Sequence, residues 1–192
     1  MKLELIFEML QQAKNLTGHQ DFVIVGSLSI LGVANQKIIP AEMSMSNDVD
    51  CYTKTDPSRI FDLVETLGEN TAFHEKTGIF LDAVSPELPT LPDGWRNRLM
   101  KVGRDGLRAW FLDPNDAAIS KYARGEPRDR RWIEAGISRG LISLSMVQFR
   151  VHETTFLDPE EENRVKTAVG EDLKRLGPPN EDKKTARKKP RP

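Results

Sequence analysis

Two aspartates, Asp48 and Asp50, stand two residues apart in a short apolar stretch at 48–52. In a β-strand, alternate side chains point to the same face, so the two carboxylates would lie together while Val49 and Cys51 point the other way. Carboxylates are the ligands that Mg²⁺ takes in company with substrate phosphates, as one ion or as two. An isolated Asp-x-Asp pair is more typical of the solvent-exposed face of an amphipathic strand, so its neighbours in the sequence decide its interpretation.

A third acid and a glycine turn supply that context. Asp82 interrupts the otherwise apolar run at 79–84, where an unpaired carboxylate is costly to bury. It is either a hydrogen-bonded residue at a strand edge or a third metal ligand, which could also accept a proton from an attacking hydroxyl. Gly26 and Ser27 stand where a strand turns into a helix. There, backbone N–H groups and the Ser27 hydroxyl could face a phosphate.

The elements that would position these residues follow from the spacing of apolar side chains. The spacing predicts helices over 5–16, 27–34, 57–67, 114–122, 132–137 and 159–176, and strands over 21–26 and 48–52. Two hairpins are expected, one over 73–84 with its turn at 75–78 and one over 99–112 with Asp105-Gly106 in its turn. The stretch 35–47 has no clean period and is expected to be a surface loop.

Composition excludes several classes of protein. The chain has 192 residues, of which 38% are hydrophobic and 30% charged, as is typical of a globular domain with appendages. Cys51 is its only cysteine, which excludes an intrachain disulfide and favours a cytoplasmic protein. The first residues resemble neither a signal peptide nor a transit peptide, and no apolar run approaches the roughly 20 residues expected of a membrane span.

The charges are distributed unevenly. The net charge is only -1, yet residues 181–192 are rich in Lys and Arg, and the body before them is mildly acidic. Residues 178–192 have almost no apolar side chains and are expected to form a disordered basic tail. That tail could follow an RNA backbone or simply act as a solubilising terminus, and both interpretations remain open.

The combination of motifs resembles the nucleotidyltransferase superfamily, the group related to DNA polymerase beta. The matching residues are Val25-Gly26-Ser27, Asp48-Val49-Asp50 and Asp82. The spacer before Asp48 is longer than in that pattern, which implies an inserted loop at 34–46.

Residues 94–99, 112–121 and 123–129 are similar to an uncharacterised bacterial nucleotidyltransferase-like family of the DUF6036 type, related to AbiEii-type toxins. Glu126 stands where that family usually has a basic residue. The two resemblances together cover residues 20–140.

The resemblance implies an α+β fold, with a nucleotidyltransferase-type mixed sheet flanked by helices and a helical C-terminal part. The expected divisions are a nucleotidyltransferase-like domain at 1–140, a helical extension at 141–177 and the tail at 178–192. Asp48, Asp50 and Asp82 would be catalytic and would bind Mg²⁺, and Gly26 and Ser27 would hold the nucleoside triphosphate.

Lys121 either reaches the nucleotide phosphates, as the resemblance implies, or belongs to a solvated helix face. The implied reaction moves a nucleoside monophosphate to a hydroxyl of tRNA, another RNA, a protein or a small molecule. Such an enzyme could be the toxin of a toxin–antitoxin pair, with a cognate antitoxin as its partner. The alternative is an inactive binding or regulatory module with the same fold, such as an antitoxin.

Overall fold

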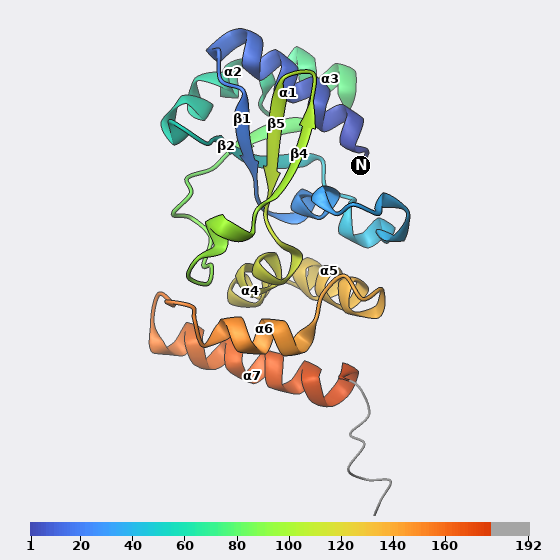
Figure 1. Ribbon diagram of the computed structural model, residues 1–192, viewed down its shortest axis with the longest axis vertical. Coiled ribbons are helices and arrows are strands. Elements are labelled where there is room, and N and C mark those ends of the chain that lie inside the picture. Colours follow the sequence, from blue (N-terminus) through green and yellow to red (C-terminus); the bar gives the residue numbers. More distant parts are fainter. Residues whose placement is uncertain (178–192) are drawn as a thin grey trace, which may run out of the picture.

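A computed structural model describes residues 1–177, which form a five-stranded mixed sheet with helices around it (Figure 1). The strands are β1 (Asp21–Ile24), β2 (Asp48–Thr53), β3 (Phe80–Ala83), β4 (Met100–Arg104) and β5 (Leu107–Phe111). Their order in the sheet is β3-β2-β1-β5-β4. The pairs β1/β5 and β2/β3 are parallel, and the pairs β1/β2 and β4/β5 are antiparallel. The predicted α+β class with a mixed sheet is confirmed.

The helices fall into two groups along the chain. Those before β5 are α1 (Leu3–Thr17), α2 (Val64–Leu67), α3 (Ala72–Thr77) and the 3₁₀ helices η1 (Ser27–Gly32), η2 (Gln36–Ile38), η3 (Ala41–Met43), η4 (Pro57–Leu63) and η5 (Trp95–Arg98). Those after β5 are α4 (Pro114–Arg124), α5 (Pro127–Ser138), α6 (Leu144–Val151) and α7 (Pro159–Leu176). In Figure 1 this second group forms a helical layer below the sheet. The predicted boundary at residue 140 falls between α5 and α6.

The core lies where the central strands meet α1. β1 is buried along almost its whole length because it lies between β2 and β5. Phe22, Ile24 and Phe111 are fully buried there, as are Ile6 and Leu10 on the inner face of α1. Each buried side chain of this size stabilises the fold by about 1.5–3 kcal/mol relative to the exposed state. The apolar run that predicted the first strand is therefore the centre of the sheet.

A buried ion cluster attaches α6 and η5 to the start of α4. Asp116 is fully buried and accepts hydrogen bonds from Arg98 Nε at 2.9 Å and from Arg150 Nη1 at 2.8 Å. Arg150 Nη1 also lies 2.5 Å from Oδ1 of Asp113, the residue that caps α4. Buried charges persist when they are paired in this way. The cluster holds α4 in place, and α4 carries Lys121 and Arg124.

Most predicted elements are present, but the hairpin over 73–84 is wrong. Residues 72–77 form α3, because the Thr71 hydroxyl accepts a hydrogen bond from the N–H of His74 and Gly78 ends the helix in a left-handed conformation. The strand that follows, β3, pairs with β2 in parallel. A parallel pair needs a long crossover, which η4, α2 and α3 supply.

Three further differences concern helices: two are of the 3₁₀ type, and one was not predicted. The helix predicted over 27–34 is the 3₁₀ helix η1, and the first part of the one predicted over 57–67 is the 3₁₀ helix η4. α6, capped by the hydroxyl of Ser143, was missed as a separate helix. Residues 178–192, predicted to be a disordered basic tail, lie outside the described residues.

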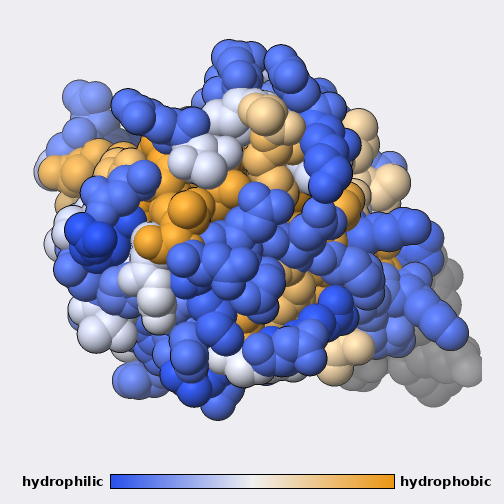
Figure 2. All heavy atoms as spheres, turned by 90° about the horizontal axis from the view of Figure 1, so that it is seen from above, coloured by the Kyte–Doolittle hydropathy of each residue, from blue (hydrophilic) through white to orange (hydrophobic). Residues whose placement is uncertain are grey.

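Figure 2 looks down on the end of the molecule where α1, α2 and α3 lie in Figure 1. The surface there is mainly hydrophilic and is interrupted by a hydrophobic area. Within residues 1–177, no helix combines the length and the apolarity needed to span a bilayer.

Candidate functional site

Three carboxylates meet on one face of the sheet at the β2/β3 pair. Asp50 and Asp82 are direct partners in the parallel register, and Asp48 lies two residues before Asp50 on the same face of β2. One carboxylate oxygen from each residue lies within 4.8 Å of the other two. Asp48 and Asp50 are half-buried and Asp82 is exposed. The predicted convergence of the three aspartates therefore exists in the fold, and its donor set suits a hard divalent cation.

The cluster disfavours its own ionisation. Burial, followed by the neighbouring carboxylates of Asp48 and Asp82, raises the pKa of Asp50 to about 6, although Lys121 and Arg124 oppose the shift. Burial also raises the pKa of Asp82, with Asp48 and Glu69 adding to the effect. Negative charges held this close repel one another, so a cation placed among them would be favoured.

A serine in the loop before β2 contacts the cluster. The hydroxyl of Ser46 donates a hydrogen bond to Oδ1 of Asp48. The sequence pattern offered no signal for this contact, because 35–47 lacks a clean period. The two short 3₁₀ helices η2 and η3 lie within this loop. The loop that lengthens the spacer thus returns to the carboxylates instead of extending away from them.

Gly26 packs directly against Asp50. Its backbone has φ 63° and ψ -153°, a combination that is essentially restricted to glycine. A Cβ atom at this position would lie 1.9 Å from Oδ2 of Asp50. The N–H of the preceding residue, Val25, donates to the backbone oxygen of Asp50 at 2.9 Å. The turn predicted from Gly26-Ser27 is therefore adjacent to the acidic cluster, and glycine is required there for both conformation and space.

Lys121 lies beneath the glycine turn. Its ammonium group donates to Oγ of Ser27 at 2.8 Å and to Oδ1 of Asp129 at 3.1 Å, and its side chain is only 4% exposed. Burial lowers the pKa of Lys121, and the Asp129 carboxylate opposes that shift. Trp132 covers the same place, with its ring centroid 4.8 Å from the ammonium nitrogen and its indole N–H directed at the backbone oxygen of Ser27. The structure thus connects Lys121 to Ser27 through a direct contact.

Arg124 is a functional candidate that the sequence analysis did not single out. Its guanidinium binds the Asp129 carboxylate, with Nε 2.8 Å from Oδ2, and its side chain remains 45% exposed. It lines the same pocket as Asp50 and Gly26. Its position in α4, three residues after Lys121, is a signal that could have pointed to it, because such a spacing puts both cations on neighbouring parts of one helix face.

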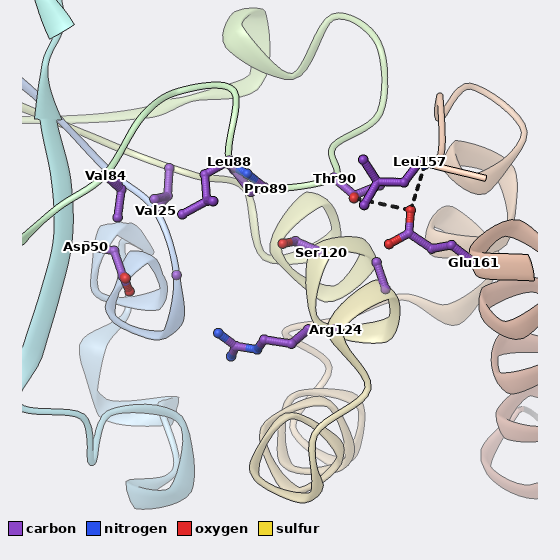
Figure 3. A pocket seen from close by; sticks show the side chains of 12 residues that line it. Val25, Asp50, Val84, Leu88, Pro89, Thr90, Ser120, Arg124, Leu157 and Glu161 are labelled. Atoms are coloured by element: carbon purple, nitrogen blue, oxygen red, sulfur yellow. Dashed lines mark hydrogen bonds between the residues drawn. The ribbon is translucent and has the colours of Figure 1, made fainter. Parts of the chain in front are cut away.

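A pocket of about 340 Å³ opens beside the glycine turn (Figure 3). Asp50 lies at one end of the view, and Ser120 and Arg124 project from α4 toward the middle. Glu161 of α7 and Thr90 lie at the other end. The size falls within the range of small-molecule sites, and the mixture of apolar walls and a few polar groups is typical of them.

Two further hollows are lined by other residues of the candidate site. One of about 240 Å³ is lined by Ser27, Ser46, Arg128 and Arg131 among others. The other, of about 430 Å³, is lined by Asp48, Asp82, Glu69 and Phe61 among others. The carboxylates are therefore reached from two sides, Asp50 from the mainly apolar pocket of Figure 3 and Asp48 and Asp82 from the hollow that Glu69 also lines, whereas the hollow beside Arg128 and Arg131 reaches Ser27.

Comparison with protein families gives one match. The family described as "Nucleotidyltransferase of unknown function (DUF6036)" matches residues 4–175. Those residues run from α1 to α7 and include all six residues of the predicted site. The comparisons with curated proteins and with solved structures found no match.

Proposed function

Because the chain belongs to the DUF6036 family of nucleotidyltransferases, we propose that it transfers a nucleoside monophosphate from a nucleoside triphosphate to a hydroxyl group, with Mg²⁺ as cofactor. The observation that carries this proposal is the approach of Asp48, Asp50 and Asp82 to within 4.8 Å of one another beside the Gly26 turn. The family description supports the type of reaction, and the site geometry supports the residues.

The donor set fits magnesium. All three side chains offer carboxylate oxygens, and magnesium binds through carboxylates together with substrate phosphates. Asp48, Asp50 and Asp82 would hold the ion or ions. When bound, Mg²⁺ would neutralise charge on the phosphates and stabilise the entering and leaving oxygens of an in-line displacement.

The residues around the carboxylates would bind and orient the triphosphate. Gly26 makes room for the Asp50 carboxylate beside the turn, since a Cβ there would collide with it. The hydroxyl of Ser27, held by Lys121, would donate to a phosphate oxygen. Arg124, partly exposed in the pocket, would place a guanidinium near the same phosphates.

In the transfer itself, the acceptor hydroxyl oxygen forms a bond to the α-phosphorus, and the bond from that phosphorus to the bridging oxygen of the β-phosphate breaks. Pyrophosphate leaves with the electron pair of the broken bond. Asp82 would take the hydroxyl proton, since it is the exposed member of the cluster and faces the hollow that Glu69 also lines. The acceptor could be tRNA or another RNA, a protein side chain or a small molecule.

The test is transfer of a labelled nucleotide by the full-length chain. The protein is incubated with each α-labelled nucleoside triphosphate, Mg²⁺ and, separately, total tRNA, a protein extract and a mixture of small hydroxyl compounds. We expect label to enter one acceptor class, and Asp48→Asn and Asp50→Asn to abolish the transfer without changing the folded state. Exposed Asp62→Asn serves as the matched control.

Two other outcomes decide between the alternatives. Binding of Mg²⁺ and nucleotide without transfer to any acceptor would favour an inactive regulatory module. Absence of both binding and transfer would reject the proposed enzyme. If transfer occurs, growth arrest on induced expression of the wild type but not of Asp50→Asn would identify a toxin.

A further inference from the structure

The pocket beside Gly26 continues well past the carboxylates. Figure 3 shows Asp50 at one end and Thr90 and Glu161 at the other, with Ser120 and Arg124 projecting from α4 between them. Only the first end and Arg124 take part in the function proposed above. The second end is built from two distant parts of the chain: the segment after β3, and the segment before α7 together with the first turn of that helix.

The walls between the two ends are apolar. They are formed by the side chains of Val25, Val84, Leu88, Pro89 and Leu157. Such walls suit a flat, weakly hydrated ring system more than they suit phosphates or a sugar. A nucleotide whose phosphates lie beside Arg124 would therefore place its base among these side chains.

Glu161 provides a hydrogen-bond acceptor at the far end. Its Oε2 accepts a bond from the backbone N–H of Leu157 at 2.9 Å and lies 3.5 Å from the Thr90 hydroxyl. Its Oε1 lies 4.0 Å from the guanidinium of Arg164, beyond hydrogen-bond distance. The residue is 7% exposed. One oxygen thus holds the segment before α7, and within the described residues the other forms no hydrogen bond.

We propose that this end of the pocket receives the nucleobase of the triphosphate and that Glu161 selects a base carrying an exocyclic amino group. The inference rests on the proposed function, because it concerns the same substrate. Adenine, guanine and cytosine each carry an amino group that can donate to Oε1. Uracil has no amino group, and its N3–H lies between two carbonyl oxygens that a carboxylate repels, so UTP is the disfavoured substrate.

The experiment measures binding of ATP, GTP, CTP and UTP to the full-length chain with Mg²⁺ by calorimetry. Wild type is expected to bind UTP about tenfold or more weakly than the best of the other three, the discrimination typical of one good base contact. Glu161→Gln keeps the size of the side chain and its ability to accept from Leu157, while its amide can also donate to a uracil carbonyl. This variant should reduce the disadvantage of UTP by about tenfold.

Two controls separate this inference from the function on which it rests. Glu162→Gln changes the adjacent carboxylate, which pairs with Lys166 on the surface, and should leave all four affinities unchanged. Asp50→Asn should weaken all four triphosphates alike. Equal binding of UTP in wild type, or identical preferences in wild type and Glu161→Gln, would overturn the role of Glu161 while the nucleotidyltransferase proposal stands. Failure of every triphosphate to bind wild type would overturn both.

Discussion

Gly26 and Asp50 share a space that admits no side chain: a Cβ on the glycine would lie 1.9 Å from Oδ2 of the aspartate. The contact joins the turn after β1 to the middle of β2, and the backbone bond from Val25 N–H to the Asp50 oxygen fixes the same approach. Any residue with a Cβ at position 26 must therefore displace the carboxylate that lies at the centre of the acidic cluster.

Gly26→Ala should destabilise the chain and weaken binding of Mg²⁺ and nucleotide. Gly140→Ala is the matched control, because Gly140 also has a positive φ, 68°, but nothing lies within 4 Å of the point that a Cβ atom would occupy there. Both variants bear a backbone cost of about 1–3 kcal/mol for a positive φ, and only Gly26→Ala adds a clash with Asp50. Urea unfolding and calorimetry measure the two effects. Equal losses of binding in both variants would argue against this role of the contact.

Arg150→Met should be strongly destabilising, because it leaves the fully buried Asp116 with Arg98 as its remaining cation among the described residues. Removal of one partner from a buried ion pair typically costs about 3–5 kcal/mol. Arg59→Met removes an exposed partner of Asp62 and should cost about 1 kcal/mol or less. The midpoints of urea denaturation measure the difference, and similar costs for the two variants would contradict the importance of the buried cluster.

Lys121 and Arg124 both bind Asp129, but Lys121 should mainly stabilise the fold, whereas Arg124 should mainly bind the triphosphate. Lys121→Met removes a buried ammonium from Ser27 and Asp129 and should cost about 3–5 kcal/mol of stability. Arg124→Met changes a side chain that is 45% exposed, so it should cost less stability while it weakens binding of the triphosphate. Unfolding and nucleotide titration of each variant separate the two roles. A higher free energy of unfolding for Lys121→Met than for Arg124→Met would contradict this assignment of roles.

The free energy of unfolding should decrease at low pH as the carboxylate of Asp21 becomes protonated. A bidentate bond from Arg108 lowers the pKa of this carboxyl from 3.8 to about 2, helped by the indole N–H of Trp110 and opposed by burial. Because the folded pKa lies below the unfolded value, the stabilisation is present above about pH 4 and is lost as the pH falls toward 2. The difference in unfolding free energy between wild type and Asp21→Asn should shrink across this window. A constant difference between about pH 6 and about pH 2.5 would count against the ion pair.

Local sequence signals were sufficient for much of this protein. The alternation in Asp48–Thr53 placed Asp48 and Asp50 on one face, and β2 has that pattern. Asp113 with Pro114, and Asp158 with Pro159, predicted the starts of α4 and α7 at their observed positions. The family match supports the superfamily that the motifs indicated, whereas the relationship to AbiEii-type toxins stays a prediction.

Other features depended on contacts between distant segments. Residues 73–84 were expected to form a hairpin, but β3 pairs in parallel with the distant strand β2, and residues 72–77 belong to the crossover as a helix. The sequence analysis singled out neither Arg124 nor Glu161, although Arg124 stands only three residues after Lys121. They became candidates only because α4 and α7 pack so that both side chains line one pocket.

The sequence by itself determined which residues could bind a cation and on which elements they stand, because strand and helix periods are properties of neighbouring residues. The tertiary structure decided that Asp82 lies beside Asp50, that Lys121 is buried beneath Ser27, and that one pocket joins Asp50 to Glu161. Those relationships depend on strand order and helix packing, which are set by burial of the whole apolar core and cannot be read from any single stretch of the chain.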